Sequence, residues 1–192
     1  MLNGYYRGAS EFLISNASHI HTEGDGPGND QAHSAYNPCK RSDPITTVVR
    51  TSQVLVHAPL QTVFDYVSDL TKHPEWSGGE LKIEAVSSGP IAVGKEYLSK
   101  GEVAIQKERP NQLQITEYEP PRKFGFVAKD PDFGKVSHVF TFTEQNDGVL
   151  VTRTMTVSLN PLMAFLFRIF IYLLIGKPSM NRAMAALKKR LE

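Results

Sequence analysis

The spacing of hydrophobic residues between positions 45 and 75 predicts one strand followed by short helices. Residues 46–56 (TTVVRTSQVLV) are rich in β-branched side chains that partly alternate with polar ones, which indicates a strand. Pro59 suits the first turn of a helix, and apolar residues recur at helical spacing through residues 60–68. Asp69 can cap a second short turn through residue 72, which His73-Pro74 ends or bends.

Six strand-like runs separated by turn residues follow this helical region. Arg109-Pro110-Asn111 is predicted to break the chain between the second and the third run. Asn146-Asp147-Gly148, between the last two runs, is typical of a tight hairpin. The runs cover residues 81–86, 94–105, 113–118, 123–128, 135–144 and 149–159.

The hydrophobic period becomes helical after Asn160-Pro161, where Asn160 can cap a helix and Pro161 suits its first position. Gly176-Lys177-Pro178 is predicted to interrupt this helix, and Ser179 to cap a final one through Leu191. Antiparallel strands with helices at both ends predict an α+β fold. Because strands twist, the sheet curls, and a long helix across its concave face leaves a space lined by inward-facing side chains.

The apolar segment at residues 162–175 has two interpretations. It is shorter than the roughly 20 residues that span a membrane, and Arg168 adds about 2.5–3.5 kcal/mol to the cost of insertion. We therefore predict that it is buried against the sheet. A helix that is apolar on every side has more apolar surface than one sheet covers, so part of it is a candidate for contact with a membrane or a partner. From Pro161 onward six basic residues face one acid, a net charge of +5 that suits acidic lipid headgroups.

Composition and charge narrow the functional classes only a little. The chain has 192 residues, of which 41% are hydrophobic and 21% are charged, enough for one domain with a real core. The net charge of +1 and the absence of a nucleic-acid-binding motif or a central basic stripe argue against a nucleic-acid partner. Cys39 is the only cysteine, which rules out an internal disulfide and fits a reduced, cytoplasmic location.

Residues 1–43 differ from the rest and are predicted to be a disordered leader, with the folded domain at residues 44–192. Residues 24–30 (GDGPGND) combine chain breakers and acids without any hydrophobic period, so they cannot offset the entropy cost of ordering. The first fifteen residues lack the basic and apolar regions of a signal peptide. His19, His21 and His33 have no carboxylate or thiol at a familiar ligand spacing, so we predict no metal site.

Five stretches of the folded part resemble, in their order and spacing, the START-related, polyketide-cyclase-like superfamily (SRPBCC). This resemblance implies a helix-grip fold with an internal ligand cavity, and the long C-terminal helix as one wall of it. It also implies that Trp76 lies near the mouth, in the loop after the short helices, and that residues 119–121 form a tight hairpin corner. The stretches are VLVHAP (54–59), VFDYV (63–67), HPEW (73–76), TEYEPPRK (116–123) and FTFTE (140–144) with Gly148.

Three side chains interrupt or punctuate the apolar pattern and are candidates for a ligand site. Trp76 either stacks on a flat ligand or plugs the end of the core. His138 lies on one predicted face with Val136 and Phe140, so it either orients a ligand carbonyl or acts as acid or base, or is a core histidine bonded to a neighbouring strand or to a tyrosine. Arg153 breaks the apolar face of the last strand in the same way.

A buried arginine needs a partner, because an unpaired charge in the interior is costly. An acid such as Glu117 or Asp65 is one such partner, a ligand carboxylate is another, and extension to solvent is the third solution. If the last two strands form a hairpin, Arg153 and His138 lie at similar depth. We expect the rest of the cavity lining to consist of two tyrosine hydroxyls and five apolar side chains: Tyr97, Tyr118, Phe126, Phe140, Met155, Phe165 and Ile169.

The sequence lacks the common signatures of catalysis, so we expect a binding protein before an enzyme. It has no glycine-rich phosphate loop, nucleophile elbow, zinc-ligand cluster or paired carboxylates, and we expect no cofactor and no metal. The first hypothesis is a carrier or sensor of a small apolar or amphipathic molecule such as a lipid, isoprenoid or polyketide. The second is a cyclase-like or aromatase-like enzyme that works by positioning a chain near His138 and Arg153. The third is a protein that docks on a membrane or partner through its C-terminal helix.

Overall fold

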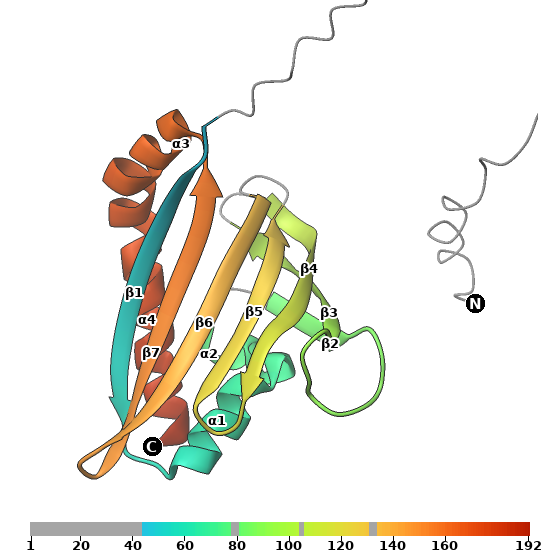
Figure 1. Ribbon diagram of the computed structural model, residues 1–192, viewed down its shortest axis with the longest axis vertical. Coiled ribbons are helices and arrows are strands. Elements are labelled where there is room, and N and C mark those ends of the chain that lie inside the picture. Colours follow the sequence, from blue (N-terminus) through green and yellow to red (C-terminus); the bar gives the residue numbers. More distant parts are fainter. Residues whose placement is uncertain (1–43, 78–80, 104–105, 131–133) are drawn as a thin grey trace, which may run out of the picture. The chain divides into compact units, whose positions relative to one another are not determined.

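The computed structural model describes residues 44–77, 81–103, 106–130 and 134–192. The predicted leader, with its histidines and Cys39, lies outside these described residues, so the predictions about it stay predictions. The described chain forms one antiparallel sheet of seven strands in the order β1-β7-β6-β5-β4-β3-β2 (Figure 1). Short helices follow the first strand, and a long helix follows the last, as the sequence predicts.

The elements have the following bounds. The strands are β1 (Thr46–Val56), β2 (Leu81–Ala85), β3 (Glu96–Val103), β4 (Gln106–Glu119), β5 (Lys123–Asp130), β6 (Gly134–Gln145) and β7 (Gly148–Leu159). The helical segments are α1 (Leu60–Ser68), η1 (Leu70–Lys72), α2 (Pro74–Ser77), α3 (Pro161–Leu166), the π-helical η2 (Phe167–Gly176) and α4 (Lys177–Leu191).

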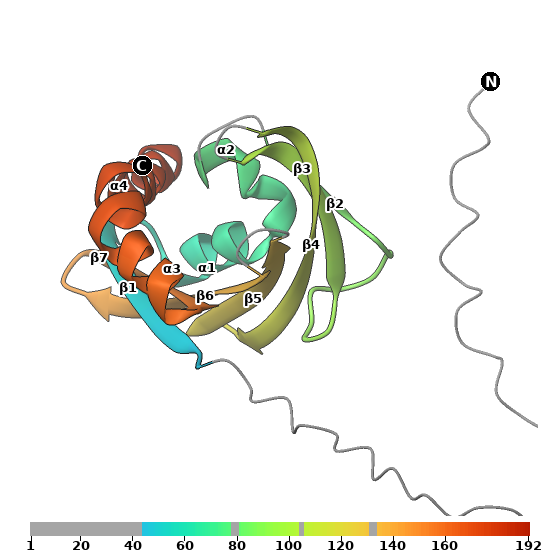
Figure 2. The ribbon, with the colours of Figure 1, turned by 90° about the horizontal axis from the view of Figure 1, so that it is seen from above.

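The sheet is strongly curved, and its main core fills the concave side. Figure 2 shows α1 and α2 inside the curve, with α4 beside β1. Every connection after β2 is antiparallel between neighbours, so the twist of each strand pair accumulates in one direction. The largest side chains with almost no exposure in this core are Phe64, Leu70, Trp76, Tyr97, Ile115, Phe124, Phe140 and Leu187.

A second, smaller hydrophobic cluster lies where β1 and β7 meet α3 and η2. Its buried members are Val48, Val157, Leu159, Ala164 and Phe167. Side chains of half-buried residues, Met155 and Tyr172 among them, pack against it. The concave face is thus covered by hydrophobic contacts in two separate places.

Two turns agree with the sequence prediction. The hairpin between β6 and β7 turns at Asn146, whose φ is 53°, and pairs Gln145 with Gly148. The corner between β4 and β5 contains a cis peptide bond between Pro120 and Pro121, and the Arg122 amide donates to the Glu119 carbonyl at 2.7 Å.

Two local predictions are wrong. The chain does not break at Pro110, because β4 runs through it, paired with Lys100 of β3. Among the described residues the pairing of β4 with β5 begins at Gln112, and the described ladder partner of Pro110 is Lys100 on the β3 side alone, so a missing N–H is tolerated there. Trp76 is not in a loop at a mouth: it belongs to α2 and is only 1% exposed.

The long helix is not interrupted at Gly176-Lys177-Pro178, contrary to prediction, and extends over 31 residues, Pro161–Leu191. Its start is as predicted: Asn160 Oδ1 accepts from the Met163 amide at 2.8 Å, and Pro161 follows the cap. The Lys177 amide bonds to the Tyr172 carbonyl, and Pro178 then falls in the first turn of α4. Proline has no N–H to place there and is tolerated in that position.

The prediction that residues 162–175 are buried against the sheet is wrong for most of the segment. Only Ala164 and Phe167 are buried, whereas Leu162 and Leu174 are 69% and 72% exposed. In contrast, α4 buries Ala183, Met184 and Leu187 in the main core, and its Met180 is buried as well. The physical reason is geometric, because one long helix can follow the curved sheet with only part of its length.

Replacement of Gly148 by alanine tests the packing of the β6–β7 hairpin against β1. A Cβ on Gly148 would lie 2.6 Å from the Val56 carbonyl oxygen, a backbone atom that cannot rotate away. We expect Gly148→Ala to lower the free energy of unfolding by about 1–3 kcal/mol in chemical denaturation. Asn146→Gly, in the same turn, keeps the left-handed conformation available and serves as the control. Equal stability of the two variants would contradict this packing.

Candidate functional site

A group of polar side chains occupies the concave face between the two hydrophobic clusters. Arg153 on β7 and His138 on β6 both point to this face, because by the alternation of their strands they share a side with buried Phe140 and Val151. One guanidinium nitrogen of Arg153, Nη2, lies 3.4 Å from His138 Nδ1. The prediction that a hairpin of the last two strands places these two residues at similar depth is confirmed.

Arg153 is 9% exposed, and its charge has no carboxylate partner among the described residues. Its guanidinium lies 5.6 Å from the centre of the Phe140 ring, and its Nε has no hydrogen-bond partner. The acids proposed from the sequence are used elsewhere: Glu117 pairs with Lys123, and Asp65 accepts from Gln61 at 2.8 Å. Burial lowers the pKa of Arg153 to about 10.

The polar surface continues onto β1, through two residues that sequence reasoning missed. Ser52 lies opposite Arg153 in the ladder, and Arg50 lies opposite Met155. Ser52 Oγ and Arg50 Nε are buried atoms without a hydrogen-bond partner, like Arg153 Nε. We call Arg50, Ser52, His138 and Arg153 the inner polar strip. The alternation of 48–56 already placed Arg50 on the same face as Val48 and could have revealed it.

The Arg50 guanidinium lies 4.5 Å from the centre of the Tyr172 ring of η2, and its Nη1 donates to the Val49 carbonyl at 2.9 Å. Two cations therefore line one face, and neither forms an ion pair with a described carboxylate. Buried donors in this number normally have acceptors, so the inner polar strip is suited to an anionic or strongly accepting group.

His73 and Trp76 lie across from the strip, in the short helical region. Their rings are 4.3 Å apart, and the Trp76 ring lies 5.9 Å from that of Phe140. His73 Nδ1 and Trp76 Nε1 are also buried without a hydrogen-bond partner. Of the two interpretations of Trp76, the structure supports the plug of the core, with one free donor that points to no protein acceptor.

Buried His73 and half-buried His138 are both held in their neutral form. Burial, and then the nearby charge of Arg153, lower the pKa of His73 to about 3. Burial, Arg153 and His73, in that order, lower the pKa of His138 well below its usual value. Because a guanidinium only donates, His138 Nδ1 has to accept, and the ring proton sits on Nε2. The strip therefore presents further donors and no free base at Nδ1.

The other predicted residues divide into three groups. Tyr97, Phe126 and Phe140 are buried in the main core, and burial, followed by Asp69 and Tyr118, raises the pKa of Tyr97. Tyr118 is half-buried at 5.6 Å from Phe64, between ring centres. Met155 is half-buried between the strip and the second cluster.

Phe165 and Ile169 are 56% and 42% exposed, so the prediction that they line the interior is wrong. The helix turns them away from the sheet, since α3 and η2 contact it through Ala164 and Phe167.

A family model described as polyketide cyclase/dehydrase and lipid transport matches residues 46–192, the whole described domain apart from its first two residues. The chain belongs to this family. Its seven-stranded curved sheet and long C-terminal helix are the helix-grip fold that the resemblance implied.

Solved structures with the same fold are distant in sequence. Protein Ms6760 from Mycobacterium smegmatis is 16% identical with a TM-score of 0.57, over 78% of this chain and 98% of the other. Norcoclaurine synthase from Thalictrum flavum is 15% identical with a TM-score of 0.59, over 76% and 87%. The di-domain aromatase/cyclase BexL of the BE-7585A biosynthetic pathway is 14% identical with a TM-score of 0.61, over 76% and 50%. No curated protein matches the chain.

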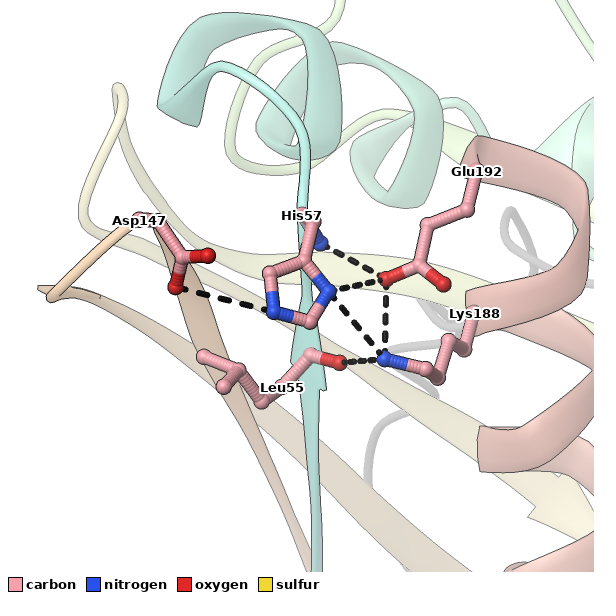
Figure 3. A network of polar contacts seen from close by, with 5 residues as sticks. All are labelled: Leu55, His57, Asp147, Lys188 and Glu192. Carbon is pink, nitrogen blue, oxygen red and sulfur yellow. Dashed lines mark hydrogen bonds and ion pairs between the residues drawn. The ribbon is translucent and has the colours of Figure 1, made fainter.

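A second polar cluster lies at the C-terminal end of β1, around His57, and Figure 3 shows it from close by. The amide and Nδ1 of His57 each lie 2.8 Å from Glu192 Oε1, and Lys188 Nζ reaches the same oxygen at 2.8 Å. Lys188 also donates to the Leu55 carbonyl at 2.7 Å, and Asp147 is 3.6 Å from His57 Nε2. These contacts, first of all that of Lys188, lower the pKa of Glu192 to about 2. The charges satisfy one another, so this cluster fastens the end of α4 to β1.

The hollow beside that cluster, with a volume of ≈ 450 Å³, is wide open and lies between His57–Leu60 and the β6–β7 hairpin. None of the residues that line this hollow belongs to the inner polar strip. The described residues contain no group of three or more His, Cys, Asp or Glu placed to hold a metal ion.

Because these histidines are neutral in the folded protein, the free energy of unfolding should depend on pH in a measurable way. A histidine with a lowered folded pKa leaves the unfolded chain with more bound protons below pH 6.5, so stability falls as the pH drops from 6.5 toward the folded pKa. We expect the free energy of unfolding to fall by about 1.4 kcal/mol per pH unit for His73 alone between pH 6.5 and about pH 5. The slope should be smaller in His73→Gln. A flat wild-type profile in urea denaturation would contradict this.

Arg153 is expected to destabilise the empty protein, because its buried charge is unpaired. Replacement by an apolar side chain of similar length removes the desolvation cost, so Arg153→Met should raise the free energy of unfolding of ligand-free protein by about 2 kcal/mol. Arg153→Lys keeps the charge and should not raise it. A loss of more than about 1 kcal/mol in Arg153→Met would mean that the charge is satisfied in the folded protein.

Proposed function

We propose that this protein binds and carries a small, largely apolar organic molecule through an anionic group, such as a carboxylate, held by Arg153. The observation that carries the proposal is the buried guanidinium of Arg153, which forms no ion pair with a described acid, within the inner polar strip of the concave face. A charge in that position costs stability unless something pairs with it, and the described chain offers no acid.

The surroundings of Arg153 support a ligand of mixed character. Arg50, Ser52 and the Nε2 of His138 add donors along the strip, and Phe126, Phe140 and Met155 supply apolar contact beside it. Inward-facing Val136, His138 and Met155 are only half-buried, so solvent reaches this end of the concave face. Ligand sites of this kind combine an apolar lining with a few polar groups that fix orientation.

Membership of a family named for cyclases, dehydrases and lipid transport fits such a ligand. Norcoclaurine synthase, a relative in fold alone, has been solved in complex with dopamine and hydroxybenzaldehyde, two small aromatic molecules. Likeness below 25% identity supports the architecture of the site and leaves the ligand of this chain to its own residues.

Binding is favoured over cyclase-like catalysis by the state of the histidines. A general base works best with a pKa near the operating pH, whereas the pKa of His73 is about 3. His138 Nδ1 accepts from Arg153 and is not free to take a proton from a substrate. The donors of the strip can orient and polarise an acceptor, which serves retention of a ligand.

The first experiment is native mass spectrometry of gently purified protein, followed by denaturing extraction of anything bound. We expect a stoichiometric apolar molecule with an acidic group. Calorimetry with dodecanoate and its uncharged counterpart dodecanol then tests the role of the charge. Dodecanoate should bind the wild type about tenfold more tightly than dodecanol, because a charge-assisted hydrogen bond contributes about 1.5–3 kcal/mol.

Arg153→Met should abolish that preference, and the matched surface variant Arg168→Met should keep it. Equal affinity of the wild type for dodecanoate and dodecanol would contradict the proposal, as would an unchanged preference in a folded Arg153→Met variant.

A further inference from the structure

The N-terminal half of the long helix carries an exposed apolar surface that the fold leaves uncovered. We call it the helix patch, and it consists of Leu162, Phe165, Ile169, Phe170, Leu173, Leu174 and Ile175, each 42–72% exposed. Figure 1 shows α3 and the segment after it at the end of the sheet, beside β1. Soluble proteins rarely expose contiguous apolar surface of this extent without an interaction that covers it.

The charged residues of the described elements that form or pack against the helix patch are all basic. β1, β7, α3, η2 and α4 contain Arg and Lys but no Asp or Glu. Arg168, Lys177 and Arg182 are exposed, and none of them forms an ion pair with a described carboxylate. Arg168 reaches only the Thr47 carbonyl, at 3.4 Å. The electrostatic complement of this surface is an anionic one.

The shape of the patch fits a fluid apolar medium better than the flat face of a protein. Leu173, Leu174 and Ile175 are consecutive and all exposed, and consecutive residues cannot share one face of a helix. A rigid partner would cover one side of this ridge, whereas lipid chains surround it. The aliphatic side chains and Phe170, next to long basic side chains that can extend to headgroups, are typical of helices at a membrane interface.

The remainder of the helix determines how deep this contact can be. By length and composition Pro161–Leu191 could cross a membrane. However, Ala183, Met184 and Leu187 of α4 are buried in the main core, Met180 is also buried, and Lys188 is bonded to β1 and Glu192. The helix patch lies within residues 162–175, about 21 Å of helix against roughly 30 Å of hydrocarbon, and one side of this segment already packs on the sheet through Ala164 and Phe167.

We propose that the helix patch docks the protein on the surface of an anionic lipid membrane, without crossing it. This inference rests on the exposure and charge of α3 and η2 and is independent of the ligand proposed for Arg153.

Flotation of the full chain with lipid vesicles tests the proposal. We expect the protein to float with vesicles of phosphatidylcholine mixed with phosphatidylserine at low salt, and much less with phosphatidylcholine alone or at high salt. Phe170→Glu/Leu174→Glu should reduce the bound fraction at least about tenfold, because two charged side chains replace apolar ones that would be buried in lipid. Val86→Glu/Val93→Glu places the same charges on exposed valines outside the helix and should bind like the wild type.

Four results would overturn the proposal, the last of them in an alkaline carbonate wash. The first is no flotation of wild-type protein that circular dichroism shows to be folded, and the second is unchanged flotation of the Phe170→Glu/Leu174→Glu variant. The third is a concentration-dependent dimer, without flotation, that the same variant dissociates, which would assign the patch to a second copy of the chain. An alkaline carbonate wash should release the bound protein, and retention in the vesicles would overturn the surface mode in favour of a spanning helix.

Discussion

The curvature of the sheet, and the limited length of helix that can follow its concave face, determine most of what is particular to this protein. Seven antiparallel strands twist in one sense and enclose α1 and α2, so the concave side is deep (Figure 2). α4 packs into this side beside β1, whereas α3 and η2 meet the sheet at its far end. The two hydrophobic clusters are separate, and the face between them is left to the polar side chains of β1, β6 and β7.

The polar side chains of that intermediate face lower the stability of the empty protein, and we assign them to ligand binding. A protein selected only for stability would place apolar residues opposite Met155 and Phe140, where Arg50 and Arg153 stand. Desolvation of an arginine whose pKa falls to about 10 is a cost in the empty protein, and neutral His73 and His138 cannot offset it. A bound acceptor would remove this desolvation cost. The same guanidinium would then lower the stability of the empty protein and help to retain the ligand.

The long helix has two halves with different physical roles. Its second half closes the main core and is fastened by Lys188 and Glu192 to the end of β1 (Figure 3). Its first half contacts the small cluster through Ala164 and Phe167 and turns the remaining apolar side chains to solvent. If that half rests on a membrane, the inner polar strip begins close to the membrane, since Arg50 of the strip contacts Tyr172 of η2. A carrier of an amphipathic molecule would then have its binding site next to the membrane that supplies such a molecule.

The sequence by itself determined the elements whose causes are local. Alternation specified β1, β6 and β7 to within one or two residues, Asn160 and Pro161 specified the start of the long helix, and Asn146-Asp147-Gly148 specified the hairpin. Alternation also placed His138 and Arg153 on one face, and five short stretches indicated the family. The breaks predicted from local spacing at Pro110 and Gly176 were wrong. Whether a missing or displaced hydrogen bond is tolerated depends on which neighbouring strand or turn needs it.

Only the tertiary structure decided which surfaces of those elements are covered. Apolarity predicted burial of residues 162–175, yet a helix can be apolar and exposed where the sheet curves away from it, as at Leu174. Glu117 and Asp65 were available in the sequence as partners of Arg153, and the fold paired them elsewhere. His73 was noted in the sequence only as part of the HPEW stretch and not as a site residue, since its ring meets Trp76 and Phe126 only after α2 packs into the sheet. Burial and pairing depend on distances between segments far apart in the chain, and those distances are not encoded in the period of any one segment.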